Sequence, residues 1–181
     1  FDYGDAHFLV LDSESPSKAM YEFAEKDLAQ SNAKWLFATW HRPPFSSSHH
    51  PSDVRMRTTY LPLLARHNVD AILVGHNHNF MLTKPIRHVY EKQQTRPYVQ
   101  IVSGGGGAYP ADFDSSDLWF ERAKTFYHVV AIDIEGEVMR GRVIDQRGRV
   151  QDRFEVDRSK PPTDAVPYEL IELERILGNV N

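Results

Sequence analysis

Five histidines lie in two short stretches of the chain, and imidazole is a side chain that binds metal ions and transfers protons near neutral pH. His41 begins the first stretch, "HRPPFSSSHH", which ends in His49 and His50, and the second stretch, "VGHNHN", holds His76 and His78. Imidazole nitrogen suits zinc, iron, manganese or copper, and three histidines are enough to hold a catalytic zinc. The spacing therefore favours a metal centre, with solvated loop histidines as the alternative.

Three of these histidines come directly after apolar, strand-like runs. Residues 34–40 precede His41, and residues 69–74 precede the segment with His76 and His78. A helical segment separates the two runs, which predicts parallel neighbouring strands with their carboxyl ends side by side. Ligands of open α/β sheets bind outside the carboxyl ends of the strands. The three imidazoles are therefore predicted to converge on one spot.

The surrounding segments alternate between strands and helices. A strand is expected within 6–14, and a helix over 17–32 has Ser17 as its N-cap. A second helix is expected over about 54–67, with Pro62 at a turn boundary or a kink. Buried runs that alternate with helices predict a parallel or mixed sheet covered by helices. The apolar positions expected on the buried face of the first helix are Met20, Phe23, Ala24 and Leu28.

Beyond Asn79 the pattern changes to strands joined by short turns. These strands are expected to be antiparallel and to finish the sheet or form a second one. Asn77 and Asn79 are expected to form turns, and the glycine-rich residues 104–117 a long mobile loop. The predicted strands lie within 87–91, 98–103, 126–134 and 137–145.

The chain divides into a main part, residues 1–158, and a tail, residues 159–181. The tail is expected to be a Pro-rich linker followed by a short amphipathic helix. The apolar positions of that helix are Leu170, Ile171, Leu173, Ile176 and Leu177.

Composition narrows the class of protein. The 181 residues are 41% hydrophobic and 25% charged, which is typical of a folded globular domain. The net charge of −4 and the absence of a basic run give no nucleic-acid-binding signature. There is no cysteine, which excludes disulfides, thiolate metal sites and thiol nucleophiles. No apolar run approaches the ~20 residues needed to span a membrane.

The segment from "WLFATWHRPPF" to "VDAILVGHNH" resembles the C-terminal half of calcineurin-like metallophosphoesterases, particularly purple acid phosphatases. The resemblance runs over about residues 34–80, and the later strands, to about residue 155, fit the closing strands of that family. It implies an α/β (α+β) fold: the C-terminal half of a four-layer α/β/β/α sandwich with mixed β-sheets. It is also the only feature that favours a secreted or periplasmic location.

The resemblance also implies roles for individual residues. His41 and His76 would bind one metal ion and His78 a second, the two divalent or trivalent ions being iron, zinc or manganese. Two such ions polarise a phosphate and generate the hydroxide that hydrolyses a small phosphomonoester substrate. His49 and His50 match a histidine pair that faces the phosphate and protonates the leaving alkoxide.

The remaining ligands of this family, including the carboxylate that bridges the two ions, belong to an N-terminal half. Gly-Asn-His, a motif of that half, does not occur in the chain. We therefore expect the chain to require a missing N-terminal half of the same domain, and to be weak or inactive alone. Two alternatives stay open: a hydrolase with a mononuclear three-histidine site, and a non-catalytic metal-binding or structural α/β domain.

Overall fold

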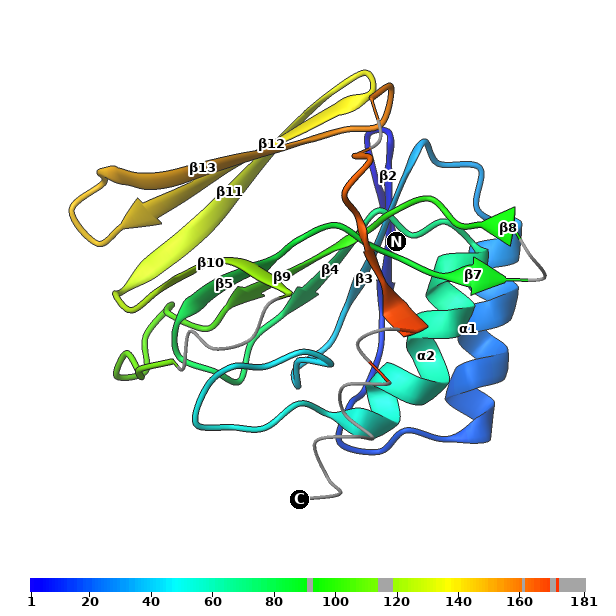
Figure 1. Cartoon of the computed structure of the whole chain (residues 1–181), viewed down its shortest axis with the longest axis horizontal. Coiled ribbons are helices and arrows are strands. Elements are labelled where there is room, and N and C mark those ends of the chain that lie inside the picture. Colours follow the sequence, from blue (N-terminus) through cyan, green and yellow to red (C-terminus); the bar gives the residue numbers. More distant parts are fainter. Residues whose placement is uncertain (91–92, 114–118, 161, 170–171, 173–181) are drawn as a thin grey trace.

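The computed structural model describes the chain except residues 91–92, 114–118, 161, 170–171 and 173–181. A seven-stranded mixed sheet forms its centre, with two helices on one face and a three-stranded sheet on the other (Figure 1). In spatial order, its strands are β1 (Asp2–Tyr3), β2 (Ala6–Val10), β3 (Trp35–Thr39), β4 (Ala71–Val74), β9 (Val99–Ser103), β5 (Phe80–Thr83) and β10 (Phe120–Lys124).

The four adjacent strands β2, β3, β4 and β9 run parallel to one another. Helix α1 (Lys18–Gln30) joins β2 to β3, and helix α2 (Val54–Arg66) joins β3 to β4. This confirms the predicted strand–helix–strand units, and it places the carboxyl ends of β3 and β4 next to each other. Strands β5 and β10 are antiparallel to their neighbours and complete the sheet.

Helix α1 begins as the sequence predicts, with the Ser17 hydroxyl accepting a hydrogen bond from the Met20 amide at 3.2 Å. Its buried residues are Ala24 and Leu28. The expectation that Phe23 belongs to the buried face is wrong, because 52% of this side chain is exposed. The buried stripe of α1 is therefore narrower than its apolar pattern suggests.

Helix α2 continues through Pro62, so the expectation of a turn boundary at this residue is wrong. Proline lacks an N–H group, so one hydrogen bond of the helix is lost. The neighbouring Leu61 and Leu63 are completely buried against the sheet, and tertiary packing of this kind supplies most of a helix's stability. Packing thus outweighs the local cost of the proline.

The second sheet is an antiparallel meander of β11 (His128–Glu135), β12 (Val138–Asp145) and β13 (Val150–Asp157). Its inner face packs on the side of the large sheet that is opposite the helices (Figure 1). One apolar cluster therefore lies between helices and sheet and another between the two sheets. The intersheet cluster includes Trp35, Phe37, Phe80, Leu82, Ile101, Met139, Val143 and Phe154.

The described residues form three layers, α/β/β, which agrees with the predicted α/β class and mixed sheets. An outer helical layer over the meander is not found in this part of the chain. No helix within the described ranges is long and apolar enough to cross a membrane.

The beginning of the tail packs against the main part. Strand β14 (Val166–Pro167) pairs in parallel with β6 (Ile86–Arg87), and Tyr168 is buried. A short hairpin of β7 (Val89–Tyr90) and β8 (Gln93–Gln94) lies nearby in sequence. The apolar positions expected for the final helix, from Leu170 onward, lie outside the described residues.

Candidate metal centre

The ends of β3 and β4 bring His41 and His76 together. The Nε2 atom of His41 lies 3.0 Å from the Nδ1 atom of His76. The backbone joins the same two loops, since the Gly75 amide donates to the His41 carbonyl at 3.0 Å. His76 has a φ of 65°, a left-handed conformation that costs a non-glycine residue energy and is concentrated at functional sites. The predicted convergence is present for this pair.

The other three histidines of the two stretches are connected to this pair through ring contacts of His50. The ring of His50 stacks on that of His76, with centroids 4.0 Å apart, and His49 contacts His50 edge to face at 4.3 Å. His78 is farther away: its ring centroid lies 6.4 Å from that of His50, and its Nδ1 atom lies 3.1 Å from the Tyr109 carbonyl oxygen. The five imidazoles thus form one cluster, but they do not share a common centre.

The donor set matches only part of a metal site. Two nitrogens, from His41 and His76, are close enough to approach one ion. Across the parts of the chain that the structure describes, however, no group of three or more His, Asp or Glu residues is placed to hold an ion. A stable site needs further donors, and a dinuclear site needs above all a carboxylate to hold two positive ions together.

Electrostatics keep the central imidazoles neutral. Partial burial, followed by the nearby His50, Arg42 and His41 side chains, lowers the pKa of His76 to about 4. Burial and then the charge of His49 also lower the pKa of His50. Neutral imidazole is the form that binds metal ions. At neutral pH the lowered pKa of His50 therefore favours its neutral form.

Arg42, directly after His41, points its guanidinium across the same surface. It pairs with both oxygens of Glu14, at 2.6 and 2.9 Å, and its Nη1 atom lies 3.4 Å from the Nε2 atom of His76. Hydrogen bonding to Arg42 lowers the pKa of Glu14, so this carboxylate stays ionised, and both of its oxygens are bound to Arg42. Glu14 therefore stabilises the arginine beside the histidines.

Asn77 joins the two histidine stretches from a buried position. It is 1% exposed, and its Oδ1 atom accepts a hydrogen bond from the His50 amide at 3.1 Å. Its Nδ2 atom donates to the Ser46 hydroxyl at 2.7 Å and to the His50 carbonyl at 3.3 Å. Asn77 thus holds the backbone of His50 on both sides, which goes beyond the turn-forming role expected from its position.

Asn79 and Gln100 hold the rest of the histidine loop. The Asn79 amide donates to the Ser48 hydroxyl at 3.0 Å and to the Ala111 carbonyl at 3.1 Å. Gln100, fully buried on β9, accepts from the Phe45 amide at 2.9 Å and donates to the Phe45 carbonyl at 2.7 Å. These contacts were not predicted from the sequence. The sequence feature that could have indicated them is the presence of amide side chains at two turn positions, Asn77 and Asn79, and within an apolar strand, Gln100.

The first glycines of the "SGGGG" run are packed, which corrects the expectation of a mobile loop for this part of 104–117. A β-carbon on Gly104 would overlap the Asn77 carbonyl group, and one on Gly105 would overlap the His128 ring. Gly106 and Gly107 have open space around them. The close packing of Gly104 against the Asn77 carbonyl group helps to fix the position of the His76–His78 segment.

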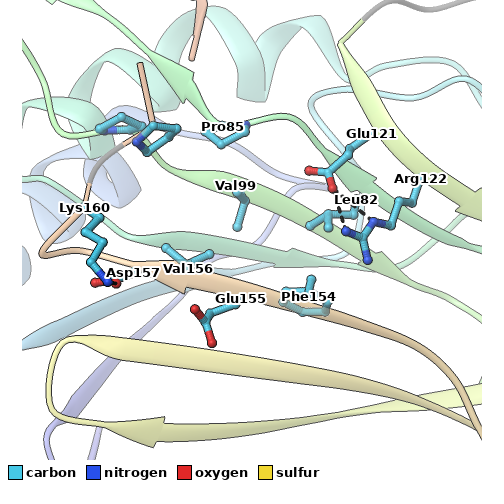
Figure 2. A pocket seen from close by; sticks show the side chains of 12 residues that line it. Leu82, Pro85, Val99, Glu121, Arg122, Phe154, Glu155, Val156, Asp157 and Lys160 are labelled. Atoms are coloured by element: carbon cyan, nitrogen blue, oxygen red, sulfur yellow. Dashed lines mark hydrogen bonds and ion pairs between the residues drawn. The ribbon is translucent and has the colours of Figure 1, made fainter. Parts of the chain in front are cut away.

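A cavity of about 230 Å³ lies elsewhere, between β5, β9, β10 and β13 (Figure 2). Figure 2 shows Val99 and Leu82 on strands of the large sheet, Phe154 on β13, and the Glu121–Arg122 pair beside them. It has no histidine among its lining residues, and Arg122 also pairs with Asp152 at 2.8 Å. The histidine cluster therefore remains the candidate site.

Known proteins match this chain in both sequence and fold. Residues 2–80, which include all five histidines, match the family model described as calcineurin-like phosphoesterase. Purple acid phosphatase 15 of Arabidopsis thaliana is 33% identical over 115 residues, and purple acid phosphatase 21 of the same plant is 29% identical over 113 residues. These alignments cover 59% and 58% of this chain but only 21% and 26% of the relatives.

A similar fold occurs in the purple acid phosphatase PPD1 from yellow lupin (Lupinus luteus) seeds. The two structures have a TM-score of 0.77 at 23% sequence identity, over 92% of this chain and 34% of the lupin chain. The chain thus spans about a fifth to a quarter of the curated relatives named above and a third of the lupin protein. Residues 2–80 are thus similar to calcineurin-like phosphoesterases, and the chain resembles purple acid phosphatases in sequence and in fold.

Proposed function

We propose that the complete protein is a metal-dependent phosphoesterase that hydrolyses small phosphomonoesters. The observation that carries this proposal is the 3.0 Å approach of His41 and His76 at adjacent carboxyl ends of β3 and β4. In this proposal His41 and His76 bind one ion, and His78 binds a second one, of iron, zinc or manganese. Metal ions would polarise the phosphate and lower the pKa of water, so that it attacks at neutral pH.

The chain's own residues would bind and orient the substrate. His49 and His50 lie beside His76, where they can donate hydrogen bonds to phosphate oxygens. The negative charge of a bound phosphate would favour protonated His50, against the burial that lowers its pKa. A protonated His50 can then supply the proton that the leaving alkoxide needs. Asn77 would hold His50 at that place through its three hydrogen bonds.

The proposal includes a partner, the N-terminal half of the same domain. Neither a third donor near the His41–His76 pair nor a bridging carboxylate is found among the described residues, so these groups must be supplied from outside them. The chain alone would then bind a metal ion weakly and hydrolyse phosphoesters poorly. A secreted or periplasmic location is part of the same proposal and follows from the likeness to acid phosphatases.

Metal binding by the chain tests this proposal without relying on activity. Titration with Zn²⁺, followed by the imidazole NMR resonances, should shift those of His41 and His76 first, and His41→Ala should remove the response. His67→Ala, at the end of α2, is the matched control and should leave it unchanged. Shifts of equal size in all histidines, or no effect of His41→Ala, would contradict the site.

The number of ions in the complete protein separates the alternatives. Two ions together with metal-dependent hydrolysis of p-nitrophenyl phosphate support the phosphoesterase. One ion would favour the mononuclear three-histidine hydrolase, and no ion would favour a structural domain.

A further inference from the structure

The C-terminal tail, of which the structure describes residues 162–169 and Glu172, is attached to the main part of the chain beside helix α2. Strand β14 pairs in parallel with β6. Tyr168 is 8% exposed, and its ring stacks on that of His88 with centroids 4.1 Å apart. These contacts hold the tail in place and bring its next residues to α2.

Two side chains of the tail meet on one residue of α2. The Tyr168 hydroxyl donates to the Arg57 carbonyl at 3.3 Å, and the Glu172 carboxylate lies 2.9 Å from the Nε atom of Arg57. Both side chains of this ion pair are largely buried, with 4% of Arg57 and 16% of Glu172 exposed. A guanidinium stays protonated in proteins, so a charge in this position needs a carboxylate beside it. Glu172 therefore stabilises a buried cation.

Arg57 extends from α2 to the histidine loop, residues 41–50. Its guanidinium carbon lies over the face of the Phe45 ring, 5.4 Å from the ring centre. The ring attracts a cation in this position, and the attraction is stronger where water is excluded. Phe45 is fully buried, four residues after His41. Arg57 thus contacts the side chain of the same residue whose backbone is held by Gln100.

The N-terminus of α2 is also joined to this loop through the backbone. The Asp53 amide donates to the Pro43 carbonyl at 2.8 Å. Arg57 lies in the first turn of the helix, and its amide donates to the Asp53 carbonyl at 2.9 Å. A displacement of Arg57 would therefore reach the loop by two routes, through the Phe45 ring and through the helix end.

We propose that Glu172 is a positioning residue of the candidate metal centre, acting through Arg57 and Phe45 on the histidine loop. The inference rests on the proposed function, in which this loop carries the metal ligand His41. Without the Glu172 carboxylate, the Arg57 charge would turn toward water and leave the Phe45 ring. The loop would then hold its histidines less firmly against His76. The tail would thus control the site without touching it.

The test titrates residues 1–181 with Zn²⁺ and follows the imidazole NMR resonances of His41 and His76. Glu172→Ala should weaken Zn²⁺ binding by about three- to tenfold, less than the ~10–100-fold typical of a group bonded directly to a metal ligand. Before any metal is added, this substitution should also shift the amide resonances of residues 45–50. These shifts report on the loop itself, because residue 172 lies far from it in sequence.

Glu169→Ala is the matched control. This second glutamate of the tail accepts a hydrogen bond from the Val89 amide at 3.0 Å and so holds the tail to β7. Its removal should change Zn²⁺ affinity by less than about twofold. If the tail only stabilised the fold, Glu169→Ala and Glu172→Ala would have similar effects on the site.

A double-mutant cycle shows whether Glu172 acts through Arg57. Arg57→Met replaces the buried cation with an apolar side chain, and in this background Glu172→Ala should change Zn²⁺ affinity by less than about twofold. If Glu172→Ala fails to fold, Glu172→Gln takes its place in the same cycle. It keeps an acceptor for Arg57 and should give a smaller loss of affinity that also disappears in the Arg57→Met background.

The proposal would be overturned by equal Zn²⁺ affinity of the parent chain and Glu172→Ala, by an equal effect of Glu169→Ala, or by a full effect of Glu172→Ala in the Arg57→Met background. Its failure and that of the proposed function are distinguishable. If the parent chain shows no response to Zn²⁺, the proposed function fails, and the amide shifts of residues 45–50 alone decide whether Glu172 positions the loop. If the parent chain binds Zn²⁺ and Glu172→Ala changes neither the affinity nor these amides, the metal centre stands and the positioning role fails.

Discussion

Gln100 offers a sensitive test of how the histidine loop is held. Its side chain is completely buried and bridges the amide and the carbonyl of Phe45, four residues after His41. Gln100→Glu preserves size and shape and keeps an acceptor for the Phe45 amide. It replaces the NH₂ donor with an oxygen that faces the Phe45 carbonyl oxygen. The substitution therefore changes one hydrogen bond and one charge and little else.

The magnitude follows from the pKa of the introduced carboxyl group. When this group is protonated, its O–H can donate to the Phe45 carbonyl, so the folded state favours the neutral form. Holding a carboxyl with an ordinary pKa of about 4.3 neutral at pH 7 costs about 4 kcal/mol, at about 1.4 kcal/mol per pH unit. We expect the variant to lose about 3–4 kcal/mol of unfolding free energy at pH 7.

The loss of stability caused by Gln100→Glu should depend on pH in a definite direction. Burial raises the folded-state pKa of the introduced group above its unfolded value, so the loss is largest at high pH and shrinks as the pH falls toward about 4. Urea unfolding followed by tryptophan fluorescence at several pH values, each compared with the parent chain, measures this slope. Gln146→Glu, an exposed position in the β12–β13 turn, is the control and should change stability by less than about 0.5 kcal/mol at every pH. A loss for Gln100→Glu that is small and independent of pH would refute the account of the Phe45 anchor.

Other residues give further predictions. Asn77→Ala should cost about 2–4 kcal/mol in urea unfolding, because it leaves buried partners without hydrogen bonds, whereas exposed Asn32→Ala should cost little. Gly104→Ala should destabilise by about 3 kcal/mol or more through overlap with the Asn77 carbonyl, and Gly106→Ala, with open space, by less than about 1 kcal/mol; thermal melts compare them. Burial lowers the pKa of His88 to about 4, so the unfolded chain binds more protons between pH 6.5 and 4. His88 alone should therefore account for about 2 kcal/mol of the stability lost between pH 7 and 5, and His88→Phe should remove this part of the loss; an unchanged pH slope would contradict it.

Much of the parallel core could be predicted from local pattern. Apolar runs of strand length, a capping serine at position 17 and helical spacing identified β2, α1, β3, α2 and β4 in order. Parallel pairing then followed from the helical connections, because such units have one favoured arrangement. Pro62 and Phe23 were the local exceptions, and in each case packing decided the outcome against the pattern.

The strands β5, β10 and β13 were not predicted. Phe80–Thr83 follows the histidines without a turn signal, and β10 consists of charged and partly buried residues. Such segments become strands because a neighbouring edge is available to pair with them, which is information about the sheet and not about the segment. Only the tertiary structure contains it.

For the candidate site, the sequence by itself determined which residue types are present and that His41, His76 and His78 follow strand ends. It could not decide their distances: the fold places His41 and His76 within 3.0 Å of each other but turns His78 toward the Tyr109 carbonyl. The sequence likewise contained Asn77 and Gln100, yet their function as anchors of the histidine loop depends on segments 27 and 55 residues apart. Hydrogen bonds between distant segments exist only after the chain has folded, so a local pattern can name the chemical groups while the packed structure decides which of them meet.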